Sequence, residues 1–200
     1  MMHNCPVVVS FLEALRLKDQ HLFEHSIYVG TLARDVGISM GFPQWRLDKL
    51  QMAGLLHDIG KIAIRNDILN KTTSLTDEEW EQIQMHPILG VQALQPFIEM
   101  EEVAKIVLSH HENDNGSGYP RGLKGDDIPF DAKIVRTCDV FSATVNERPY
   151  KCAYPKQEAI RLSLTGSGLN NNDIGKIREV LLRWNRSTIN QYAEETVNNL

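Results

Sequence analysis

Apolar residues recur at spacings of three and four through most of this 200-residue chain, which is the pattern of helices that bury one face. The pattern predicts helices over residues 11–17, 21–40, 43–59, 76–94, 99–111, 129–146, 156–164 and 173–197. Gly60 is expected to stop the third helix, and the segments 61–74 and 112–128 are rich in turn residues and are expected to be loops.

The fourth helix begins with a capping box, in which the Thr76 hydroxyl and the Glu79 carboxylate each satisfy a free backbone amide. Trp80 and Ile83 are expected to face inward. Pro87 either kinks this helix or begins a new one.

Histidines lie near the end of an apolar stripe in several of these helices. A lone histidine at such a position is most often a core residue with satisfied hydrogen bonds, but here the placement recurs. His110 and His111 lie about 100° apart around a helix, so both reach one ion only if the helix ends there. The turn-rich sequence that follows favours such an end. The candidate ligands are His25, His57, His86, His110 and His111.

Two aspartates, Asp58 and Asp139, have the same placement. A buried carboxylate must be paired or bound to a metal, and carboxylates together with imidazoles suit Zn, Fe, Mn or Ni. These seven side chains exceed the roughly three that a catalytic zinc takes from a protein. We therefore predict two divalent ions that share the Asp58 carboxylate. The first ion would also bind His25, His57 and Asp139, and the second His86, His110 and His111.

Two adjacent metal ions are suited to phosphodiester hydrolysis, because they lower the pKa of a shared water and stabilise charge at phosphorus. Asp58 and Lys61 are the candidate catalytic residues, and Lys61 or a water would assist protonation of the leaving oxygen. Lys61, Arg148 and Lys151 are also candidate phosphate contacts. The alternative is that these cations are solvated surface charges.

The composition limits the other partners. The formal net charge of −5 argues against a polymeric nucleic acid, although bound metals would still attract a small anion. The three cysteines lie far apart, which favours reduced thiols in a cytoplasmic protein. No apolar run approaches the roughly 20 residues of a membrane span, and we expect no signal peptide. We expect a single domain over residues 1–200.

The order and spacing of these residues resemble the HD-GYP domain family. The match covers about residues 21–151 and rests on residues 57–61, 86–87, 110–112, 116–120, 128–129, 139 and 148–151. The resemblance implies an all-α fold, an HD-domain helical bundle with a metal centre in its core and a C-terminal helical extension over about 156–197. It implies hydrolysis of cyclic di-GMP to pGpG and/or GMP, by attack of a metal-bridging hydroxide.

The resemblance also bears on cofactors and partners. It supports the ligand set above, with iron or manganese as the expected metals and zinc, nickel or magnesium as alternatives. Tyr119 of the GYP motif is a candidate substrate contact. The loop that carries Tyr119 is a candidate contact for a partner such as a diguanylate cyclase, and a homodimer is compatible with the pattern. No receiver or other sensor segment precedes the match, so we expect regulation through a partner chain or through cyclic di-GMP levels.

Three positions depart from the family pattern and leave alternatives open. His21 stands where trinuclear members have a glutamate, which favours two metals over three. Asn115 and Ser142 stand where aspartates are usual, which spares the ligand set and leaves rate and substrate preference open. The alternatives are an HD phosphohydrolase for another cyclic dinucleotide, such as a cyclic GMP-AMP, and a catalytically weak binding or interaction module.

Overall fold

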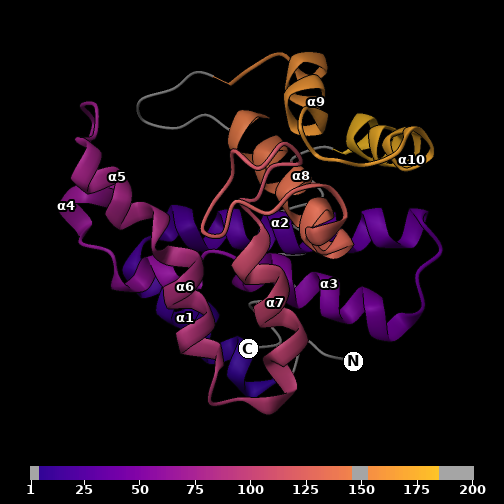
Figure 1. The fold of residues 1–200 in the computed structure, drawn as a ribbon. Helices are drawn as coiled ribbons and strands as arrows, with labels where there is room; N and C mark the ends of the chain where they lie inside the picture. The colour runs from indigo at the N-terminus through magenta and orange to yellow at the C-terminus, as the bar shows by residue number, and fades with distance from the viewer. Residues whose placement is uncertain (1–4, 146–152, 185–200) are drawn as a thin grey trace.

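The computed structural model describes residues 5–145 and 153–184, and within these ranges the regular structure is entirely helical (Figure 1). The α-helices are α1 (Pro6–Lys18), α2 (Gln20–Ser39), α3 (Gln44–Leu56), α4 (Asn66–Leu69), α5 (Asp77–Gln84), α6 (His86–Leu94), α7 (Glu101–Ser109), α8 (Phe130–Val145), α9 (Lys156–Leu164) and α10 (Asn171–Arg183). Short 3₁₀ helices occupy η1 (Ile59–Ala63), η2 (Ile98–Met100) and η3 (Gly125–Asp127). The predicted all-α fold is confirmed. In the described ranges, no helix combines the length and apolar character needed to cross a bilayer.

The helices α2 and α3 form the centre of the bundle and cross at very close range. Their crossing point pairs Gly30 with Gly54, and a Cβ added to Gly54 would lie only 2.7 Å from the Gly30 Cα. Apolar side chains such as Leu32 and Leu50 are fully buried on either side of this contact. The crossing lets backbone approach backbone, and it places the first half of α2 beside the C-terminal end of α3.

The other helices are arranged around this pair. In Figure 1, α8 lies across α2, while α6 and α7 stand together on the near side of the bundle. The helices α4 and α5 form an arm at one side, and α9 and α10 pack at the opposite, upper side. Chain segments that are far apart in sequence therefore meet at the middle of the bundle, where α2, α3, α6, α7 and α8 contribute their histidines and aspartates.

Several helix boundaries differ from the sequence expectation. The first helix begins at Pro6 rather than at residue 11, and a short helix, α4, lies inside the predicted loop 61–74. The third helix ends at Leu56, so the expectation that Gly60 stops it is wrong. Gly60 lies within η1 instead, where an added Cβ would be 2.0 Å from the His86 carbonyl oxygen. Only a glycine lets η1 pack this tightly against α6.

Other expectations hold or change in an informative way. The capping box of Thr76 and Glu79 is present, and Pro87 begins a new helix rather than kinking an old one. Trp80 is 46% exposed, so its predicted inward placement is wrong. The predicted final helix ends at Arg183, and its expected continuation to residue 197 lies outside the described residues.

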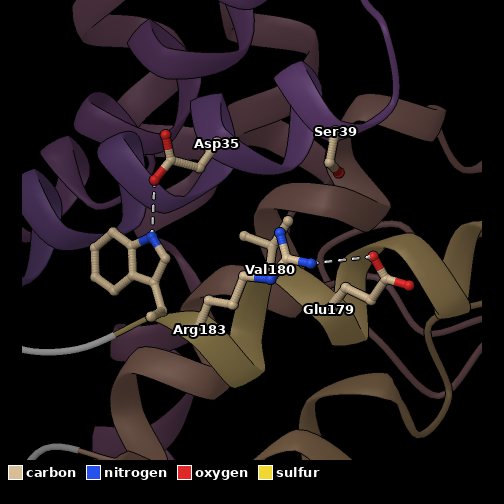
Figure 2. Close-up of a pocket in the computed structure, with 6 residues that line it drawn as sticks. Asp35, Ser39, Glu179, Val180 and Arg183 are labelled. Carbon is tan, nitrogen blue, oxygen red and sulfur yellow. Dashed lines mark hydrogen bonds and ion pairs between the residues drawn. The ribbon is translucent and has the colours of Figure 1, made fainter.

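Of the two C-terminal helices, α10 packs on α2 and α9 packs on α8. Trp184, which follows α10, donates its indole N–H to Asp35 Oδ2 at 2.8 Å and packs on Tyr28 with ring centroids 4.5 Å apart. Figure 2 shows this contact beside a pocket of about 280 Å³ between α2 and α10, next to Arg183 and Glu179. Burial raises the pKa of the Asp35 carboxyl. The pocket shares no residue with the central histidines, so it is separate from their cluster.

Candidate metal centre

The His57-Asp58 pair lies where α3 ends and the chain turns into η1. His57 caps α3 and is fully buried, and Asp58 begins η1 with 1% of its surface exposed. The Asp58 carbonyl accepts the backbone N–H of Lys61 at 2.9 Å, which closes the turn. The turn points both side chains into the space between α2, α6, α7 and α8.

Three of the buried imidazoles each make the same kind of local hydrogen bond. In each ring Nδ1 faces the backbone carbonyl three residues earlier, at 2.6 to 2.7 Å. A carbonyl can only accept, so Nδ1 carries the proton and Nε2 presents a lone pair toward the centre of the bundle. Backbone carbonyls commonly orient metal-binding histidines in this way. The pairs are His57 with Gly54, His86 with Ile83, and His110 with Val107.

The inward atoms of this cluster lack a hydrogen to share. Nε2 of His86 lies 3.2 Å from Nε2 of His110, and with Nδ1 protonated in both rings this contact joins two acceptors. Within the described residues, Nε2 of His57 and Oδ1 of Asp58 are buried without a hydrogen-bond partner. Such groups are unfavourable unless a cation lies between them. The residues therefore fit a bound metal.

The candidate ligands fall into two groups that meet at Asp58. Oδ2 of Asp58 lies 3.4 Å from Nε2 of His57 and 3.9 Å from Nε2 of His25. Its other oxygen, Oδ1, lies 3.3 Å from Nε2 of His86. Ligand atoms of His25, His57 and Asp58 lie within 4.8 Å of one another, and so do those of Asp58, His86, His110 and His111.

Asp139 extends the first group from α8. Its Oδ1 lies 3.0 Å from Nε2 of His25 and 3.8 Å from Nε2 of His57. The other nitrogen of His25, Nδ1, lies 2.9 Å from the Ser142 hydroxyl, one turn further along α8. Ser142, one of the departures from the family pattern, therefore contacts a candidate ligand instead of supplying one.

The protonation states also suit metal binding. Burial lowers the pKa of His25 and His110, that of His86 to about 3 and that of His111 to about 4. In His57 burial acts in the same direction, but the Asp58 and Asp139 carboxylates raise its pKa overall. Four imidazoles are thus neutral at pH 7, as metal ligation requires.

The two carboxylates are ionised. Burial alone would raise the pKa of Asp58, but the Lys61 ammonium, 2.7 Å from Oδ2, and the nearby imidazoles hold it well below its usual range. Burial opposes ionisation of Asp139 as well, and its bond to His25 holds its pKa low. The centre therefore combines four neutral imidazoles with two negatively charged carboxylates.

The loop after α7 is fastened beside this centre by Glu112. The Glu112 carboxylate is 1% exposed and accepts the backbone N–H groups of Arg121 at 2.8 Å and Leu123 at 2.9 Å. The Tyr119 ring stacks on His111 with centroids 4.7 Å apart and 27° between planes. Glu112 belongs to the 110–112 motif, and its role in holding this loop was not predicted from the sequence. A charged residue between a buried histidine pair and a glycine-rich loop was the available signal.

The other candidate residues have different outcomes. Arg148 and Lys151, expected to contact phosphate, lie outside the described residues. The His21 side chain is exposed and belongs to neither ligand group. Lys61 lies at the centre, beside Asp58, with its side chain 21% exposed.

Comparisons with known proteins agree with this arrangement. The family model described as HD domain matches residues 10–168. The 3′3′-cGAMP-specific phosphodiesterase 3 of Vibrio cholerae is 35% identical over 160 residues, which cover 78% of this chain and 34% of the relative. A cyclic di-GMP phosphodiesterase of Thermotoga maritima is 40% identical over 148 residues, covering 72% of this chain and 40% of the relative. The chain thus spans well under half the length of these relatives.

Solved structures show the same fold. The HD domain of the L. monocytogenes phosphodiesterase PgpH superposes with a TM-score of 0.65 at 17% identity, covering 90% of this chain and 97% of that one. A cyclic GMP-AMP-specific phosphodiesterase in V. cholerae gives a TM-score of 0.67 at 18% identity, covering 94% of this chain and 54% of that one.

The helical bundle and its central histidine and aspartate cluster define a class of proteins built around an adjacent His-Asp pair. The chain belongs to the HD-domain family, and within it to the HD-GYP type.

Proposed function

We propose that this chain is a metal-dependent phosphodiesterase that hydrolyses cyclic di-GMP to pGpG and/or GMP. The observation that carries the proposal is the cluster of buried acceptors without a shared hydrogen, His86 Nε2 against His110 Nε2 and the unpartnered Oδ1 of Asp58. Several relatives carry the name cyclic di-GMP phosphodiesterase, which supports the choice of substrate.

The proposed cofactor is a pair of divalent ions, with iron or manganese expected and zinc, nickel or magnesium as alternatives. Asp58 would contribute one oxygen to each ligand group, because Oδ2 faces His57 and Oδ1 faces His86. Such ions supply an activated water at neutral pH and positive charge for the phosphate. The chain's own part is to hold neutral imidazoles and ionised carboxylates in fixed positions.

The substrate side of the centre is proposed to consist of Lys61, Tyr119, Arg148 and Lys151. The Lys61 ammonium is partly exposed beside Asp58, where it could bind a phosphate oxygen or donate a proton to the leaving 3′ oxygen. Burial raises the pKa of the Tyr119 hydroxyl, which keeps it a neutral hydrogen-bond donor next to His111. Arg148 and Lys151 are proposed as phosphate contacts from their place in the sequence motif.

A second candidate substrate is 3′3′-cGAMP, which is favoured by the names of the V. cholerae relatives. Both substrates share the phosphodiester that would lie at the metals and differ in one purine. A purely binding role is less well supported, because none of the seven candidate ligands is replaced. A diguanylate cyclase partner at the GYP loop, a homodimer and a cytoplasmic location remain proposals from the sequence.

The test is hydrolysis of cyclic di-GMP and 3′3′-cGAMP by purified protein loaded with Mn²⁺ or, without oxygen, with Fe²⁺, with products separated by chromatography. The proposal expects turnover of cyclic di-GMP that disappears in Asp58→Ala and after chelation. Preferential turnover of 3′3′-cGAMP would select the second substrate. Binding of cyclic di-GMP without hydrolysis, under both metal conditions, would leave only the binding role.

A further inference from the structure

Trp80 is an exposed aromatic side chain on an anchored stretch of backbone, close to the candidate metal centre. It lies in the first turn of α5, directly after the capping box, and its backbone N–H bonds to the Thr76 carbonyl at 2.9 Å. Glu79, the other half of the capping box, also pairs with Lys71 at 2.5 Å and so ties α5 to the segment before it. The backbone of Trp80 is therefore well anchored, while its indole remains 46% exposed.

A series of aromatic rings connects Trp80 to the candidate ligands. Trp80 meets Tyr119 with centroids 6.4 Å apart and 76° between planes, and Tyr119 stacks on His111 at 4.7 Å. His111 in turn lies 5.0 Å from the His86 ring. Trp80 and Tyr119 thus form an aromatic corner, two rings nearly at right angles, at the border between the centre and solvent.

The shape of the proposed substrate would bring its purines to this aromatic corner. In a cyclic dinucleotide one phosphate lies at the reacting position, so the purines must extend away from it toward the rim of the site. In the proposed function Arg148 and Lys151 bind phosphate, and no residue is assigned to the nucleobases. A half-exposed indole beside the centre offers the flat, sequence-tolerant surface on which nucleobases stack.

We propose that Trp80 is a stacking residue for one purine of the cyclic dinucleotide, with Tyr119 forming the second side of the corner. This inference rests on the proposed function and adds a base-binding element to the same site. A stacked purine strengthens substrate binding without touching the bond that breaks. Loss of the indole should therefore raise KM by roughly ten-fold and leave kcat unchanged.

The experiment compares Trp80→Ala and Trp80→Phe with Trp45→Ala. Trp45 is 65% exposed and contacts Lys49 on α3, outside the aromatic series, so it controls for loss of a surface indole. Each variant is assayed with cyclic di-GMP and with methyl p-nitrophenyl phosphate, a phosphodiester that carries no purine. Thermal unfolding of each variant confirms that the fold is intact, and calorimetry measures binding of cyclic di-GMP to chelator-treated protein.

The expected result is a ten-fold higher KM for cyclic di-GMP in Trp80→Ala, a change below about three-fold in Trp80→Phe, and no change in Trp45→Ala. Hydrolysis of methyl p-nitrophenyl phosphate should be unaffected in all three variants. An unchanged KM in Trp80→Ala, or an equal loss with both substrates, overturns the stacking role while the proposed function stands. If the unaltered protein hydrolyses no cyclic dinucleotide, calorimetry decides separately: equal affinity of Trp80→Ala and unaltered protein, or no binding by either, overturns the stacking role too.

Discussion

Adding a single methyl group at Gly60 should disrupt the metal centre. A Cβ at this position would lie 2.0 Å from the His86 carbonyl oxygen, 2.6 Å from the Gly90 nitrogen and 2.9 Å from the His86 carbonyl carbon. All three atoms belong to the backbone of α6, so no side-chain rotation relieves the contact. In Gly60→Ala, η1 and the first turn of α6 must therefore move apart by about 1 Å to restore ordinary contact distances.

A movement of that size matters because metal sites tolerate deviations of only about 0.2 Å in ligand distance. His86 begins α6, and its Nε2 lies 3.3 Å from Oδ1 of Asp58 across the same contact. A bound metal ion contributes about 10–16 kcal/mol of binding free energy. Divided among four ligands, this is roughly 3 kcal/mol for each, which corresponds to about a hundred-fold in affinity. Gly60→Ala should lower the affinity for the ion bound by the His86 group by about that factor. It should also destabilise the fold by about 1–3 kcal/mol.

The assay is metal content after dialysis against a weak chelator, with thermal unfolding measured in parallel. Gly175→Ala is the matched control, because an added Cβ at this position in α10 meets nothing within 4 Å. Gly175→Ala should keep its metal and gain about 0.5–1 kcal/mol of stability, as expected for alanine in a helix. The reasoning is refuted if Gly60→Ala retains metal as strongly as the unaltered protein.

Three further predictions follow from the same contacts. Asp58→Asn should lose both ions. The control Asp131→Asn removes another buried carboxylate that pairs with cations, so it should lower stability and leave the metal content intact. Equal metal loss in the two variants would argue against a shared ligand. Glu112→Ala leaves two loop N–H groups without their acceptor. The KM for cyclic di-GMP should therefore rise, and amide hydrogen exchange in residues 119–123 should become faster. Unchanged exchange would contradict the role of Glu112 in holding the loop. The lowered pKa values of His86, to about 3, and His111, to about 4, mean that below about pH 6.5 the folded metal-free chain binds fewer protons than the unfolded chain. Its free energy of unfolding should fall between pH 7 and pH 5, by roughly 2 kcal/mol for each of these imidazoles, and a Tm that stays constant or rises over that range would be inconsistent with buried neutral rings.

Local signals predicted much of the fold. The helix over residues 156–164 has the bounds expected from its periodicity, and the capping box begins α5 at the expected residue. The helix α7 ends at Ser109, so His110 and His111 can both face one centre, as the turn-rich sequence indicated. These features depend on residues within one or two helical turns, which is the range over which sequence patterns are informative.

Features set by contacts between distant segments were not predictable in the same way. Gly60 resembles a helix stop in sequence, and its actual constraint is the backbone of α6, some 26 residues away. Trp80 lies on α5, which stands on an arm of the bundle (Figure 1), and its ring contacts Tyr119 and solvent rather than the core. Glu112 binds the backbone amides of Arg121 and Leu123, and although its position between the histidine pair and the loop singled it out, the sequence did not indicate which groups it would bind. The ligand assignments themselves remain predictions that agree with the geometry.

The most direct test of the account is the number of metal ions per chain in protein purified without added metal, determined by elemental analysis alongside turnover of cyclic di-GMP. Two ions that share Asp58 predict about two equivalents of iron or manganese and turnover that falls as they are removed. A chain that carries no bound metal and still hydrolyses the cyclic dinucleotide at full rate would contradict the central claim.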